Sequence, residues 1–96
     1  MTLFHRRILT EDLENLPDFT AHPAEIPITQ FCGREIADLA PDAIHRETLN
    51  DIARAIVDRG WRYGVRSCEI TVRRDYHTVN GRRVGATRMI GRVTYA

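Results

Sequence analysis

The chain has 96 residues, of which 43% are hydrophobic and 28% are charged, and its formal net charge is +1. This length fits one small domain spanning residues 1–96, and the composition excludes a chain that is disordered throughout. No apolar run approaches the roughly 18 residues of a membrane span. Met1–Arg7 also lacks the apolar core of a signal peptide, so we expect a cytoplasmic protein without a membrane partner.

Charge is distributed unevenly along the chain. Residues 1–60 contain six arginines and eleven acidic residues, a net charge of −5. Residues 61–96 contain eight arginines and two acidic residues, a net charge of +6. Such asymmetry is typical of a protein that binds a polyanion. The alternative interpretation is that the two halves neutralise each other within the fold.

The first part of the chain, residues 1–41, is acidic and rich in proline. Thr2–Ile8 predicts either a short edge strand or a loose arm. Thr10 is followed by two acidic residues, which predicts an N-cap and the first turn of a short helix. That helix must end before Pro17.

Residues 17–28 hold three prolines and predict an extended connector. Thr29 is a candidate cap for a second short helix. Four apolar side chains then follow near helical spacing, although Gly33 weakens this prediction. They are Phe31, Cys32, Ile36 and Leu39.

Residues 42–96 hold the regular elements, and residues 43–59 carry the strongest helical pattern. Asp42 is the predicted N-cap and Gly60 the predicted C′ residue. One face of this helix is apolar, which predicts packing on a sheet. It consists of Leu49, Ile52, Ala53, Ile56 and Val57.

After Gly60, from Trp61 to Arg66, aromatic or apolar residues alternate with arginine or glycine. This period of two predicts a further strand or an extended entry into the hairpin. Trp61 has two interpretations. Tryptophan is common among binding anchors, but a single tryptophan just past a helix more often seals a small core.

Asn80-Gly81 lies between alternating runs and predicts a β-hairpin with strands at about 67–79 and 82–95. The turn fixes the register, so that Cys68 faces Val93 and Val72 faces Met89 on an apolar side. A strand rise of about 3.3 Å makes this hairpin roughly 40 Å long. A domain of this size is only about 25 Å across, so part of the hairpin should project from the body.

Together these elements predict an α+β fold in which one main helix packs on a small antiparallel sheet. The projecting part of the hairpin is rich in arginine and is the predicted binding site for nucleic acid or another partner. The candidate residues are Arg73, Arg74, Tyr76, His77, Arg82, Arg83 and Arg88. Arg73 faces Arg88, and this like-charge pair needs a counter-anion, for which Asp75 is one candidate.

Three functions fit these features. The first is stoichiometric binding of nucleic acid or a nucleoprotein by the hairpin, without any enzymatic chemistry. The second is an inhibitor from a phage or plasmid that binds a host defence complex, as anti-CRISPR proteins do. The third is a metal-independent ribonuclease using His77, Asp75 and Tyr76, although His77 and Tyr76 should point to opposite faces of the strand. A homodimer through sheet edges or the Pro-rich arm is also compatible with so small a domain.

No further chemistry is indicated by sequence spacing. The four histidines are scattered, so we expect no metal site and no cofactor. Cys32 and Cys68 are too few for a disulfide framework, and we expect two small buried side chains.

Overall fold

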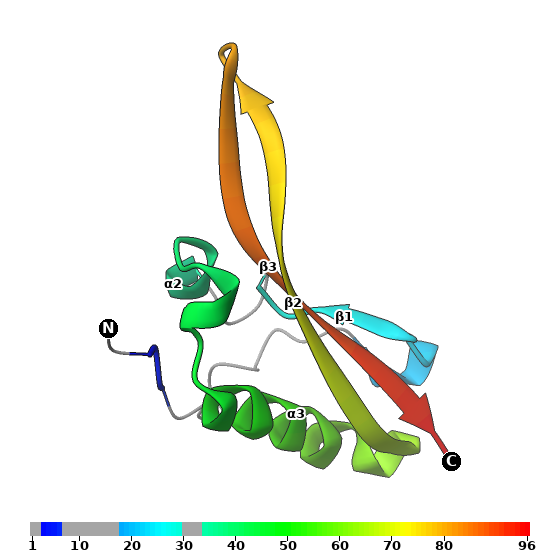
Figure 1. The fold of residues 1–96 in the computed structure, drawn as a ribbon. Coiled ribbons are helices and arrows are strands. Elements are labelled where there is room, and N and C mark those ends of the chain that lie inside the picture. Colours follow the sequence, from blue (N-terminus) through cyan, green and yellow to red (C-terminus); the bar gives the residue numbers. More distant parts are fainter. Residues whose placement is uncertain (1–2, 7–17, 30–33) are drawn as a thin grey trace.

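The computed structural model describes residues 3–6, 18–29 and 34–96 and shows an α+β fold, as predicted. One long helix packs on a three-stranded antiparallel sheet with strand order β1-β3-β2 (Figure 1). None of the helices among these residues is both long and apolar enough to cross a membrane. The helices are α2 (Arg34–Ala37) and α3 (Arg46–Gly60), the strands are β1 (Glu25–Pro27), β2 (Val65–Val79) and β3 (Arg82–Tyr95), and the 3-10 turns are η2 (Phe19–Ala21), η3 (Pro41–Ala43) and η4 (Trp61–Tyr63).

The hairpin of β2 and β3 confirms the predicted turn and register. Asn80 and Gly81 both have positive φ, 51° and 77°, as a type I′ turn requires. Every pair from Ser67–Thr94 to Val79–Arg82 is the predicted one, and a bulge between Val65 and Ser67 shifts the register at the open end. The alternation of side chains between the two faces of the hairpin is therefore also as predicted.

The predicted extended connector at 17–28 is partly wrong, because this segment forms η2 and the edge strand β1. Asp18 caps η2 by accepting hydrogen bonds from the backbone N–H and hydroxyl of Thr20, which also lower the pKa of its carboxyl. In β1, Ile26 is fully buried. Pro27 is tolerated there because an edge strand does not need every N–H.

Helix α3 begins at Arg46, later than the predicted start at 43. Asp42 lies in η3 and Ile44 is extended, because Ile44 forms a parallel bridge with Phe4. The cap is therefore His45, whose Nδ1 accepts a hydrogen bond from the backbone N–H of Glu47 at 3.0 Å. The predicted cap was wrong because a long-range contact holds the backbone extended through Ile44.

The end of α3 also differs from the prediction. Gly60 keeps a helical backbone, and the left-handed residue is Gly64 with φ 98°. A Cβ on Gly60 would lie 2.4 Å from Cγ2 of Val65, so the glycine serves a close approach between α3 and β2. The alternating stretch from Trp61 to Arg66 was predicted only in part: Trp61–Tyr63 form η4, where the chain reverses, and Val65 and Arg66 begin β2.

The core lies between α3 and the sheet. Ile52 and Ile56 of α3 are fully buried, as is Met89 of β3. Burying each such side chain contributes about 1.5–3 kcal/mol. Cys68 lies at the edge of this core, and its burial raises the pKa of the thiol to about 11, so it is a neutral, structural side chain. Among the residues that the structure describes, the other buried apolar side chains are Phe19, Ile26, Ile28, Ile36, Ile44, Val65 and Val93.

Some predictions fall outside the described residues. These are the short helix at Thr10, the stop at Pro17 and the position of Cys32. The prediction of a second short helix is met in part, since α2 is helical and Ile36 is buried.

Candidate nucleic-acid interface

The hairpin divides into two halves. We call residues 67–72 and 89–94 the body half, because α3 and β1 pack against it, and residues 73–79 and 82–88 the tip half. Figure 1 shows the tip half rising beyond the helices and β1. The protein measures 44 × 29 × 20 Å, and its length comes from this projection. The expected overhang is therefore present.

The tip half is strongly basic. It holds five arginines and one acidic residue. Four of these arginines are exposed, namely Arg73, Arg82, Arg83 and Arg88. Because alternate residues point to opposite faces, Arg83 lies on one face and the other three lie on the opposite face.

Asp75 bridges the like-charge pair on one face of the tip half. One carboxylate oxygen lies 3.1 Å from Nε of Arg73, and the other lies 3.4 Å from Nη1 of Arg88. All three side chains are about half exposed, so these ion pairs contribute little to stability. Asp75 is thus the predicted internal counter-anion, and it leaves a net positive charge on this face.

The opposite face presents an aromatic ring. Tyr76 is 56% exposed, and the guanidinium carbon of Arg83 lies 4.2 Å from the ring centroid. In this cation–π contact the guanidinium lies over one face of the ring, so that two flat groups from adjacent strands are stacked. Flat aromatic and guanidinium surfaces are the groups on which nucleobases stack.

The outermost part of the hairpin mixes apolar and basic side chains. Val79 is 45% and Val84 39% exposed, and they flank the turn together with His77 and Arg82. His77 is exposed and occupies the strand position after Tyr76, so the two point to opposite faces. The candidate residues therefore surround the tip rather than forming one patch.

Arg74 has a different environment from the other candidates. Its Nη1 donates to the carbonyl oxygen of Leu39 at 2.8 Å and to Oγ1 of Thr87 at 3.2 Å. Its Nη2 donates to the carbonyl oxygen of Gly85 at 3.2 Å. The prediction that Arg74 projects freely was wrong, because the chain after α2 reaches the hairpin at this point. Arg74 braces the base of the tip half.

A second aromatic and basic surface lies at the opposite end of the molecule from the turn. Trp61 is 54% exposed, so it does not seal the core, and the guanidinium carbon of Arg66 lies 3.9 Å from its ring centroid. Beside it is an open hollow of about 680 Å³. The hollow is lined by Asp18, Phe19, Asp58, Arg59, Trp61, Arg62 and Tyr63. Its mixed charges suit a nucleic acid less well than the tip half does.

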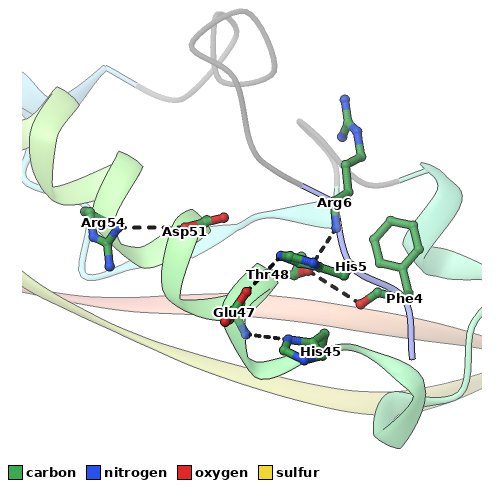
Figure 2. A network of polar contacts seen from close by, with 8 residues as sticks. All are labelled: Phe4, His5, Arg6, His45, Glu47, Thr48, Asp51 and Arg54. Carbon is green, nitrogen blue, oxygen red and sulfur yellow. Dashed lines mark hydrogen bonds and ion pairs between the residues drawn. The ribbon is translucent and has the colours of Figure 1, made fainter. Parts of the chain in front are cut away.

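Folding also brings His5 next to two side chains that are distant from it in the sequence. His5, His45 and Glu47 lie at the start of α3, with Nε2 of His5 3.4 Å from Oε2 of Glu47 (Figure 2). The expectation of no metal site rested on separation along the chain. The bridge between Phe4 and Ile44, which has no local sequence signal, makes these residues neighbours.

Comparison of the chain with family models, with curated proteins and with solved structures returned no match. The function must therefore be inferred from the fold and the geometry of the hairpin.

Proposed function

We propose that this protein acts by stoichiometric binding and that the tip half of the hairpin engages nucleic acid. The observation that carries the proposal is the projection of a ribbon with five arginines and one acid beyond the packed body. A charge of this sign and density, displayed on an extended element, favours a polyanionic partner. No enzymatic step is part of the proposal.

The shape of the tip half suits a groove. The tip half holds seven residue pairs, from Arg73–Arg88 to Val79–Arg82, which corresponds to about 23 Å of ribbon at the usual strand rise. The major groove of duplex DNA is about 12 Å wide and admits a two-stranded β-ribbon. Arginines on both faces of such a ribbon can reach phosphates on both walls of the groove. The ring of Tyr76 offers unpaired bases a stacking surface, so single strands are the second substrate to test.

Affinity should arise mainly from counterion release. Each phosphate neutralised contributes about −0.9 to the slope of log K against log salt for duplex DNA. If the four exposed arginines each contact one phosphate, the expected slope is about −3.6. Arg74 adds charge but is held by Leu39, so we expect no direct phosphate contact from it.

The test is equilibrium binding to duplex DNA, single-stranded DNA and RNA at several salt concentrations. We compare wild type with Arg82→Ala/Arg83→Ala and with a control, Arg54→Ala/Arg59→Ala, which removes the same charge from the exposed face of α3. We expect the hairpin variant to lose affinity and to reduce the salt slope by about 2. The control should leave both nearly unchanged. Equal effects of the two double variants, or no binding at low salt, would refute the proposal.

A protein or nucleoprotein partner is the second candidate. The exposed valines beside the turn, Val79 and Val84, favour it, because phosphate contacts alone do not need apolar side chains. Tyrosine and arginine are also enriched in protein-binding hot spots. An inhibitor of a host defence complex would fall in this class. If the partner is a protein, the chain should capture a host protein in stoichiometric amount, and Val84→Asp should abolish this capture. The affinity for that protein should depend only weakly on salt.

A ribonuclease gains no support from the hairpin. Tyr76 and His77 point to opposite faces, and the carboxylate of Asp75 is engaged by Arg73 and Arg88. A general base and an acid would have to act on one phosphate from the same side.

A further inference from the structure

We propose that His5, His45 and Glu47 bind a divalent transition-metal ion of the zinc type. Each residue offers one ligand atom, and these three atoms all lie within 4.8 Å of one another. Within residues 3–6, 18–29 and 34–96 this is the one place where three histidine, cysteine or carboxylate side chains come so close. The site lies beside the body, away from the hairpin tip, and does not depend on the function proposed above.

The backbone around the site is fixed by hydrogen bonds. The N–H of Phe4 donates to the carbonyl oxygen of Ala43 at 2.6 Å, and the N–H of His45 donates to the carbonyl oxygen of Phe4 at 2.7 Å. On the other side of His5, the N–H of Arg6 donates to Oγ1 of Thr48 at 3.1 Å, as Figure 2 shows. His5 is therefore attached to the start of α3 through both of its neighbours.

The chemistry of the donors selects the metal. Two imidazoles and one carboxylate are the ligands that zinc takes in many open sites, with bonds of about 2.0–2.2 Å. Tetrahedral neighbours are then roughly 3.3–3.5 Å apart, and the imidazole nitrogen of His5 already lies 3.4 Å from the carboxylate oxygen of Glu47. Magnesium and calcium prefer several oxygen ligands and are poorly served by one carboxylate.

The three side chains can adjust without disturbing the core. The side chain of His5 is 46% exposed and that of Glu47 is 67% exposed. The two imidazole rings are tilted by 34°, with centroids 4.9 Å apart. Small rotations can thus direct one nitrogen of each ring to a common ion, and the exposed side leaves room for a water ligand.

Metal binding must compete with the cap of α3. In a neutral imidazole only one nitrogen has a free lone pair, and in His45 this is Nδ1, which accepts from the N–H of Glu47. A metal at Nδ1 takes that lone pair, and a metal at Nε2 moves the proton to Nδ1. In either case the cap hydrogen bond is lost, and the partial positive charge of the helix N-terminus further opposes a cation. We therefore expect micromolar rather than nanomolar affinity.

The test is calorimetric titration of the full chain with zinc chloride, with magnesium chloride as the hard-cation comparison. The informative variants are His5→Ala, Glu47→Gln and His45→Asn, and asparagine at 45 keeps a side-chain cap for α3. The matched control is His77→Ala, which removes an exposed imidazole at the hairpin tip. Circular dichroism before titration checks that each variant is folded.

We expect one zinc ion to bind per chain, with affinity reduced at least tenfold in each of the three variants and unchanged in His77→Ala. Magnesium should give no comparable signal. The proposal is overturned if zinc does not bind in the micromolar range, or if it binds folded His5→Ala and His45→Asn as tightly as wild type.

Discussion

The two halves of the hairpin share the same strands and the same register but have different surroundings. In the body half, Met89 and Val93 are buried at 0% and 5% exposure and belong to the hydrophobic core. In the tip half, most side chains are exposed and arginine-rich, and the buried Thr87 lies at its base beside Arg74. One continuous ladder thus carries the core at one end and a candidate binding surface at the other.

This difference predicts that stability depends mainly on the body half and binding on the tip half. An isolated two-stranded hairpin is at best marginally stable in water. The tip half therefore depends on the strands continuing into the packed body and on the brace from Arg74 to Leu39. Because its exposed side chains do little for folding, they are free to serve binding. The following substitutions test this separation.

The largest expected effect comes from truncating the core in the body half. Met89→Ala should destabilise the protein by about 3 kcal/mol, because it leaves a cavity at a fully buried site. Val84→Ala, on the same strand in the tip half, should change stability by less than about 0.5 kcal/mol. Urea denaturation measures both. If the two substitutions cost the same, the tip half is packed and the division into halves fails.

The adjacent residues Arg73 and Arg74 should differ in how much they contribute to stability. Arg74→Ala removes hydrogen bonds to Leu39, Thr87 and Gly85 and should cost about 1.5 kcal/mol of stability. Arg73→Ala removes only an exposed ion pair with Asp75 and should cost at most about 0.5 kcal/mol.

For nucleic-acid binding, we expect the effects of these two substitutions in the opposite order. Arg73→Ala should weaken nucleic-acid binding more than Arg74→Ala does, measured where both variants are folded. A larger binding loss in Arg74→Ala would mean that the brace itself, or a rearranged Arg74, contacts the partner.

The smallest expected effect is an increase in nucleic-acid affinity. Asp75→Asn removes the carboxylate between Arg73 and Arg88 and should raise nucleic-acid affinity a few-fold at low salt. Asp51→Asn is the matched control, since Asp51 pairs with Arg54 on α3, away from the tip. Fluorescence anisotropy measures both variants. Unchanged or weaker binding in Asp75→Asn would show that the acid does not face the partner.

The hairpin could be predicted from the sequence because its information is local. Asn80-Gly81 specifies the turn, and every pair from Ser67 to Val79 follows from it by counting. The main helix was predicted for the same reason, since its apolar face repeats at helical spacing. The concentration of arginine after residue 60 also indicated that the hairpin is basic.

The features that could not be predicted depend on distant contacts. The bridge between Phe4 and Ile44 delays the start of α3 and brings His5 next to His45 and Glu47. The carbonyl of Leu39 converts Arg74 from a projecting side chain into a brace. Ile26 makes β1 part of the sheet by filling the core, although three prolines nearby favoured a connector.

The central claim is that the tip half is the interface, and amide chemical-shift mapping tests it most directly. The labelled protein is titrated at low salt with the nucleic acid that binds best. We expect the shifts to concentrate in residues 73–88, with α3 and the surface around Trp61 largely unaffected. Shifts centred on Trp61 and Arg66, or no shifts with duplex DNA, single-stranded DNA or RNA, would contradict the claim.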